Sequence, residues 1–147
     1  MEKLSPEIAL EKHYKMWNAM AKIEEENEIT GYHRFEFRMD FKEDWCRKND
    51  ENPVNNCYLC EYAFRTYLKE YGKSNQLKQL NELKSDTHVS ILMEKSICRH
   101  CPILWNNNRE NNDCEQNDVN WTLSPIKDIL ALPVNTEEIK EYHTNNT

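Results

Sequence analysis

Apolar side chains recur at helical spacing along the first part of the chain. Ser5 followed by Pro6 is typical of a helix start, because the serine oxygen caps a free amide and proline has no amide to satisfy. One face of the following segment stays apolar until its last turn and carries Leu10, His13/Tyr14, Trp17, Met20/Ala21 and Glu24. This spacing predicts a long amphipathic helix that ends between Asn27 and Gly31.

A different rhythm follows between residues 35 and 41. Apolar residues alternate here with charged ones, in the order Phe35, Phe37, Met39 and Phe41. Strict alternation favours a strand, although the same stretch can also pack as a helix. The polar stretch from Asn49 to Asn56 contains Pro53 and is predicted to be a loop.

Helical spacing returns after this loop. Cys60, Phe64, Tyr67/Leu68 and Tyr71 fit one face of a helix, and Gly72 is placed just past its end. A shorter helix is predicted from Ser74 or Asn75 to Leu83, whereas Val89 to Met93 fits no single element.

The last third contains one polar loop and one helix. The loop spans Asn106 to Asp113, and Ser124-Pro125 repeats the helix-start signal. Ile126, Ile129, Leu130 and Leu132 follow before Pro133 stops this helix. We expect a disordered tail at 143–147. Together the elements predict a mainly α fold with a little β, in one small domain spanning residues 1–147.

Composition and charge narrow the class of partner. The formal net charge of the 147-residue chain is -7, and the basic residues between Arg34 and Lys48 are interleaved with acidic ones. This pattern predicts a solvated, salt-bridged face rather than a nucleic-acid interface, and it favours a basic protein surface as partner. No apolar run approaches the roughly 18 residues of a membrane span, and the start does not resemble a signal peptide. We therefore expect a cytoplasmic protein without membrane contact.

Two Cys-x-x-Cys pairs carry the strongest chemical signal: Cys57/Cys60 and Cys98/Cys101. Each pair lets two thiolates reach one metal from a tight turn at about 2.3 Å, and two pairs complete a tetrahedron. Four soft thiolates favour zinc, with iron as the alternative. Redox dithiols and disulfides compete with this interpretation, but the βαβ pattern and the oxidising compartment that they need are not indicated.

The remaining cysteines are less clearly assigned. Cys114 can replace one ligand or lie beside the metal, whereas Cys46 is more typical of a free buried thiol. His100 lies between two predicted ligands, so a turn that aims both sulfurs at the metal should turn the imidazole away. The fold is therefore predicted to be organised around one structural zinc knuckle.

Nothing in the sequence indicates catalysis. Four protein ligands leave no open position on zinc, and G-x-S-x-G, H-E-x-x-H and phosphate-binding glycine loops are missing from a chain with two glycines. We expect a protein that is not an enzyme. The residues assigned to partner or ligand binding are His13, Trp17, Tyr62, Trp105, Glu25, Glu26 and Glu28. For His13 and Trp17 a core or interface ridge is the competing interpretation.

Three blocks of this sequence resemble a group of small phage and prophage zinc-binding proteins. They are Lys12-His13-Tyr14-Lys15-Met16-Trp17-Asn18, Asn55-Asn56-Cys57-Tyr58-Leu59-Cys60-Glu61-Tyr62-Ala63 and Cys98-x-x-Cys101-Pro102-Ile103-Leu104-Trp105. Cys114, Trp121 and Ile129-Leu130-Ala131-Leu132-Pro133 are further matching points. The resemblance implies a phage origin and a zinc site, but no reaction, and it makes Cys114 a stronger candidate member of that site than its spacing alone does. The chain departs from the group in longer stretches at 24–48 and 74–97.

The sequence favours a phage-encoded accessory protein of the host cytoplasm. It would bind and inhibit a host protein, for which a component of an antiviral defence system is one candidate. Two alternatives stay open: a zinc-dependent nucleic-acid-binding regulator, which the charge disfavours, and a protein that captures a nucleotide signal, with Trp17, Tyr62 and Trp105 stacking on a base.

Overall fold

The computed structural model describes residues 4–49, 57–74, 96–115 and 117–146. Its elements are α1 (Pro6–Glu26), α2 (His33–Asn49), α3 (Tyr58–Ser74), the 3₁₀ turn η1 (Arg109–Asn111), α6 (Ile126–Leu130) and α7 (Thr136–Asn145). The helix and segment predicted at 74–83 and 89–93 lie almost wholly outside the described residues.

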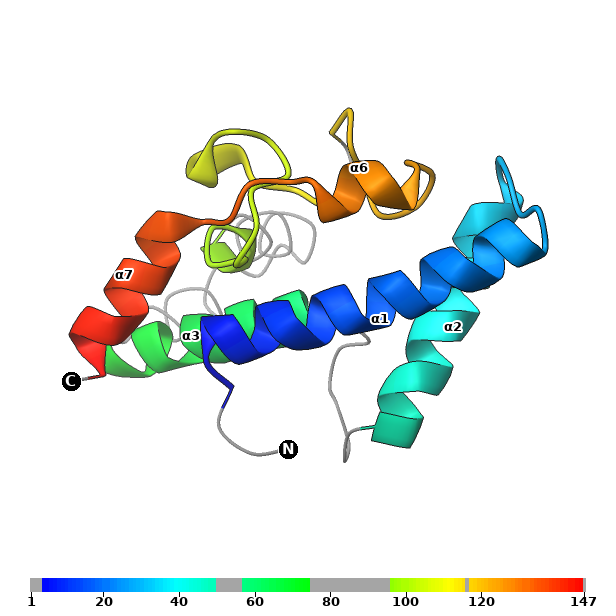
Figure 1. Cartoon of the computed structure of the whole chain (residues 1–147). Helices are drawn as coiled ribbons and strands as arrows, with labels where there is room; N and C mark the ends of the chain where they lie inside the picture. The colour runs from blue at the N-terminus through cyan, green and yellow to red at the C-terminus, as the bar shows by residue number, and fades with distance from the viewer. Residues whose placement is uncertain (1–3, 50–56, 75–95, 116, 147) are drawn as a thin grey trace, which may run out of the picture.

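Helix α1 is the central element of the fold (Figure 1). It contacts α3 along its N-terminal part, α6 on another side and α7 near its beginning, while α2 follows its C-terminal end. The prediction of a mainly helical chain is confirmed. The predicted β contribution is wrong for the described residues, where the β pairing is an isolated bridge between Ile103 and Val134.

Helix α1 begins and ends as its sequence predicts. The Ser5 hydroxyl accepts from the amide of Ile8 at 3.2 Å, and Pro6 occupies the first turn. The buried positions follow the predicted stripe, with Trp17 almost fully enclosed. After the helix, Gly31 adopts a φ of 60°, a conformation that glycine tolerates without strain.

The predicted strand at 35–41 is wrong, because this stretch lies within α2. Its buried face consists of Arg38, Lys42 and Cys46, which follow one another at helical spacing. Phe37, Phe41 and Trp45 run beside them, with neighbouring ring centroids 5.7 and 5.8 Å apart. A cationic buried face conceals the helical period from a pattern search that looks only for apolar residues.

Arg38 holds α2 in place against two other parts of the molecule. Its guanidinium is fully buried and donates to both carboxylate oxygens of Glu24, at 2.8 and 3.2 Å. It also donates to the carbonyls of Trp121 and Ser124, at 3.0 and 2.6 Å. The expectation of a solvated basic face is therefore wrong for Arg38 and Lys42, both of which are buried.

Three boundaries differ from the sequence prediction. Helix α3 continues past Gly72 to Ser74. Helix α6 lies where Ser124-Pro125 predicts it, but Ser124 accepts from the amide of Asn120 at 2.9 Å and does not cap the helix. Helix α7 runs to Asn145, so residues 143–145 are helical rather than disordered; the Asn135 side chain caps it by accepting from the amide of Glu138.

Candidate metal centre and adjoining pocket

Five cysteines from three separate segments line one small cavity. They are Cys57, Cys60, Cys98, Cys101 and Cys114, and the indole of Trp105 forms part of the same wall. Cys46 does not line it and is a buried thiol of α2. The structure thus brings together both predicted cysteine pairs and Cys114.

Local structure explains how each pair faces the cavity. Cys57 precedes α3 and accepts from the amide of Glu61 at 2.9 Å, so Cys60 lies in the first turn of the helix. Cys98 and Cys101 span a tight turn that is closed by a hydrogen bond of 3.0 Å from the amide of Cys101 to the carbonyl of Cys98. A Cys-x-x-Cys spacing brings two sulfurs to one side of such a turn.

The thiols lie close enough to shift one another's protonation. The hydrogen bond with Cys60, followed by burial, raises the pKa of Cys57, which nearby Lys42 opposes. Contact with Cys114, followed by burial, raises the pKa of Cys60. Burial raises the pKa of Cys101, opposed by a hydrogen bond with the backbone of Ile103. Packed together without a cation, these thiols stay protonated at neutral pH, whereas a coordinating dication deprotonates thiols outright.

The donor set therefore fits a soft metal ion such as zinc. Buried thiols that raise one another's pKa can ionise together once a cation compensates their negative charges. The side-chain positions do not themselves form the closed tetrahedron of four sulfurs that the sequence predicts. Among the described residues, the group with ligand atoms all within 4.8 Å of one another is His100, Glu138 and Glu141 rather than a set of cysteines.

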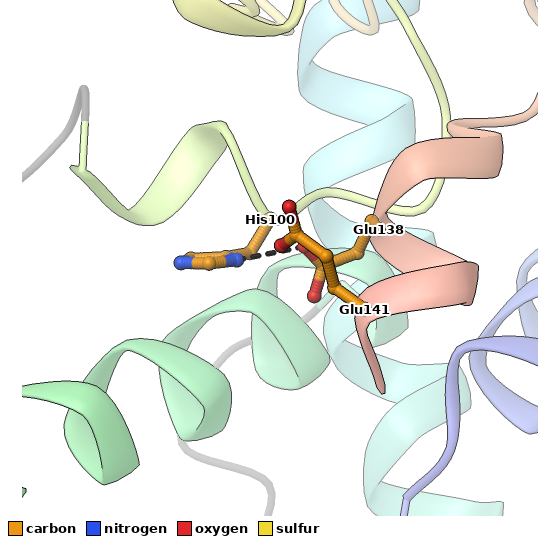
Figure 2. Close-up of side chains that lie close together, drawn as sticks. All are labelled: His100, Glu138 and Glu141. Atoms are coloured by element: carbon orange, nitrogen blue, oxygen red, sulfur yellow. Dashed lines mark hydrogen bonds and ion pairs between the residues drawn. The ribbon is translucent and has the colours of Figure 1, made fainter. Parts of the chain in front are cut away.

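His100, Glu138 and Glu141 already have partners within the protein (Figure 2). Arg109 donates to Glu138 at 2.5 Å and to both oxygens of Glu141 at 2.7 Å. Hydrogen bonding to Glu141, reinforced by Glu138, raises the pKa of Arg109 above its ordinary value. Since one guanidinium is hydrogen-bonded to both carboxylates, this cluster is an internal ion-pair network rather than a metal site.

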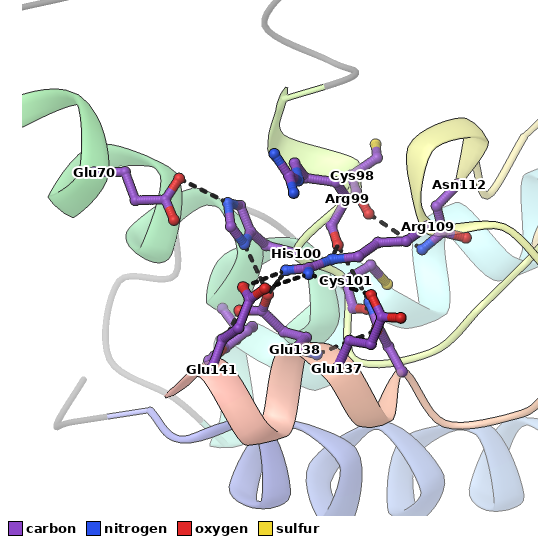
Figure 3. Close-up of polar contacts among 12 residues, drawn as sticks. Glu70, Cys98, Arg99, His100, Cys101, Arg109, Asn112, Glu137, Glu138 and Glu141 are labelled. Atoms are coloured by element: carbon purple, nitrogen blue, oxygen red, sulfur yellow. Dashed lines mark hydrogen bonds and ion pairs between the residues drawn. The ribbon is translucent and has the colours of Figure 1, made fainter. Parts of the chain in front are cut away.

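The network fixes the cysteine turn from outside (Figure 3). His100 turns away from the cysteine cavity, as predicted, and lies 2.8 Å from Glu138 and 3.0 Å from Glu70. Arg109 and Asn135 both donate to the carbonyl of Arg99, at 3.0 and 3.2 Å. The carbonyls of this turn are therefore held by side chains from the following loop and from the start of α7.

A larger cavity of about 250 Å³ adjoins the cysteines. It shares Cys57, Cys60, Cys114 and Trp105 with the first cavity and is further lined by His13, Trp17, Met39, Lys42, Glu43, Glu115 and Trp121. The Lys42 ammonium lies 4.0 Å from the centroid of the Trp121 ring. Three indoles, one imidazole and one buried ammonium therefore surround a space beside the candidate metal centre.

The other predicted binding residues fall in three places. His13, Trp17 and Trp105 line the larger cavity, whereas Tyr62 does not: its hydroxyl donates to Glu138 at 2.7 Å in the core. Glu25, Glu26 and Glu28 are exposed at the end of α1. Lys42 and Trp121 were missed as site residues, although helical spacing with Arg38 and Cys46 could have revealed Lys42.

Comparison of the chain with protein-family models, with curated proteins and with solved structures finds no match. Among the described helices, none has the length and apolar content needed to cross a membrane.

Proposed function

We propose that the protein is a phage-encoded accessory protein that binds and inhibits a host protein, and that one structural zinc ion stabilises its fold. The observation that carries the binding function is an exposed apolar surface on α2 within an acidic border. The convergence of five thiols on one cavity supports the zinc ion.

The exposed surface consists of Tyr32, Phe35 and Met39, which we call the α2 surface. Tyr32 directly precedes α2, whereas Phe35 and Met39 lie one turn apart on the helix, and the three side chains are 85, 40 and 49 % exposed. Phe35 also contacts the ring of Trp121 at a centroid distance of 5.7 Å, which anchors the surface to the core. Exposed apolar groups gathered in this way are typical of protein-binding sites.

Acidic side chains border the α2 surface. Glu36 and Asp40 are exposed and directly follow Phe35 and Met39, while Glu25, Glu26 and Glu28 are exposed just before the helix. Opposite charges on a partner would accelerate association and orient the encounter. The partner that fits is therefore a protein with a basic surface around an apolar depression.

Nucleic acid fits this surface poorly. Arg38 is enclosed by Glu24 and two carbonyls, while Arg47 and Lys48 pair with Glu43 and Asp44 at 2.9 Å. These cations are already neutralised, and duplex binding depends on cations that can displace counterions. We expect weak binding to generic DNA at physiological salt. Tight, salt-sensitive binding would favour the regulator instead.

Metal content tests the zinc ion. Elemental analysis of the purified protein should give about one zinc per chain, and Cys57→Ser or Cys101→Ser should lose most of it. Cys46→Ser is the matched control, because Cys46 is buried away from the cavity. Full zinc retention in both ligand variants would contradict the proposed centre.

Phage plating on hosts that carry single defence systems tests inhibition. Wild-type protein should restore plating on at least one such host, and the combined Phe35→Ser and Met39→Ser variant should not. Leu68→Ser is the control, since Leu68 is 44 % exposed on α3 but lies outside the α2 surface. Reversing Glu25, Glu26 and Glu28 to lysine should slow association with the partner while leaving zinc content unchanged. Failure of wild-type protein on every host would refute inhibition of defence.

A further inference from the structure

The indole N–H of Trp105 is buried beside the candidate metal centre without a hydrogen-bond partner. Trp105 is 6 % exposed and lines the same small cavity as the five cysteines. Its indole nitrogen makes no hydrogen bond within the part of the chain that the structure describes. Buried N–H groups in folded proteins nearly always have an acceptor, so we look for this acceptor among the atoms around the cavity.

The side-chain oxygens that line this cavity already accept other hydrogen bonds. The carbonyl oxygen of Asn112 accepts from the backbone amide of Trp105 at 2.6 Å. The carboxylate of Asp113 accepts from the amide of Glu115 at 2.8 Å. The other side chains of the lining that can accept a hydrogen bond are the cysteines.

Among the cysteines, Cys101 is the one that Trp105 contacts. Burial raises the pKa of the Cys101 thiol, whereas the backbone of Ile103 and the side chain of Trp105 lower it. The polar group of a tryptophan side chain is its indole N–H, so this group lies close to the Cys101 sulfur. A neutral thiol is a weak acceptor, whereas a charged acceptor strengthens a hydrogen bond about twofold. The N–H is therefore placed to bind a thiolate.

Asn112 holds Trp105 in a fixed position relative to the cysteine turn. Besides accepting from the amide of Trp105, its side chain donates to the carbonyl of Cys98 at 3.1 Å (Figure 3). It also donates to the carbonyl of Ile103 at 2.8 Å, and it is only 5 % exposed. One buried amide thus connects Trp105 with the first cysteine of the turn and with the segment that follows the second.

A centre made of thiolates requires donors of this kind. Four thiolates carry more negative charge than one zinc ion neutralises, and the chain itself has a net charge of -7. Hydrogen bonds to the ligands of a metal orient them and tune the affinity of the site.

We propose that Trp105 is a positioning residue of the zinc centre, whose indole N–H donates to the metal-bound thiolate of Cys101. The hydrogen bond fixes the direction of this sulfur and withdraws negative charge from it. The inference rests on the proposed zinc ion and assigns to the metal a side chain for which the sequence suggests stacking on a base.

Zinc competition with a chromophoric chelator measures the contribution of the N–H in the purified full-length protein. Trp105→Phe should bind zinc about ten- to hundredfold more weakly, the usual loss when a metal ligand loses its hydrogen-bond partner. Benzothienylalanine in place of Trp105 should weaken binding within the same range, because it keeps the outline of the indole and lacks the N–H. Trp45→Phe is the control and should bind zinc like the wild type, since Trp45 packs on Phe41 and lines neither cavity.

Cobalt in place of zinc separates hydrogen bonding from packing. Without the N–H the Cys101 sulfur holds its electrons less tightly, so the sulfur-to-cobalt charge-transfer band should move to longer wavelength with either replacement of Trp105. An unshifted band, or wild-type zinc affinity with benzothienylalanine, would overturn the assignment and leave Trp105 a packing role. A wild-type protein that holds no zinc would contradict the zinc centre itself, whereas equally tight binding by the wild type and both replacements would contradict this inference alone.

Discussion

Replacing Glu138 by alanine should destabilise the fold more than any neighbouring surface substitution. The side chain is 1 % exposed and meets partners from three parts of the chain. Arg109 donates to it at 2.5 Å, the Tyr62 hydroxyl donates at 2.7 Å, and His100 lies 2.8 Å away. The substitution leaves all three groups without this acceptor while the protein around them stays closed.

The expected size follows from these contacts. Removing one partner of a buried ion pair costs about 3–5 kcal/mol, because the remaining charge is left uncompensated. Arg109 keeps its bidentate contact with half-exposed Glu141, so the loss should lie near the lower end, at about 3 kcal/mol. For a chain of this length that corresponds to a fall in melting temperature of roughly 6–12 °C.

Urea unfolding at neutral pH, followed by circular dichroism, measures this loss. Glu137→Ala is the matched control, because Glu137 precedes Glu138 in α7 and is 74 % exposed, 3.7 Å from Arg109. The control should change stability by no more than about 0.5 kcal/mol. If Glu138→Ala lost less than about 1 kcal/mol, or no more than the control, the network would not hold the cysteine turn and our reasoning would be wrong.

Three further outcomes are expected. Arg38→Met should cost about 3–5 kcal/mol in urea unfolding, and much of this should be recovered when Glu24→Gln removes the stranded charge. Because the pKa of His13 falls from 6.5 to about 3 on folding, the unfolded chain binds this proton first as the pH is lowered. Between pH 6.5 and about 3 this residue should lower the stability by about 1.4 kcal/mol per pH unit, a contribution missing in His13→Phe. Cys114→Ser should lower zinc affinity, whereas a variant that binds zinc as tightly as Cys46→Ser would exclude Cys114 as a ligand.

Sequence patterns over a few residues predicted the elements whose formation depends on neighbouring residues. Ser5-Pro6 and the stripe through Trp17 determine where α1 starts and which face is buried, and the structure agrees. The Cys-x-x-Cys spacing likewise grouped four cysteines that line one cavity. The start of α1 and the geometry within each cysteine pair depend on residues within a few positions of one another, so the sequence alone contains the reason for them, whereas the meeting of the two distant pairs was inferred from the metal ion that they would share.

Features that depend on distant partners were not predictable in the same way. Arg38 can be buried because Glu24 and the carbonyls of Trp121 and Ser124 accept its hydrogen bonds. The two carbonyls lie far along the chain from Arg38. Without that knowledge a cationic stripe is typical of a surface, and the apolar residues beside it favour a strand. The sequence likewise does not indicate that the Tyr62 hydroxyl donates to Glu138, because this partner comes from the distant α7.

The buried Arg38 contacts also separate two kinds of sequence change on α2. Its inward residues are fixed by geometry, since the guanidinium must reach one carboxylate and two carbonyls at once. Its outward residues, among them Met39, make few such contacts and are free to vary. The buried contacts therefore hold α2 in place independently of its exposed side chains. A library of substitutions at the exposed positions could be screened for new binding partners without changing the interior.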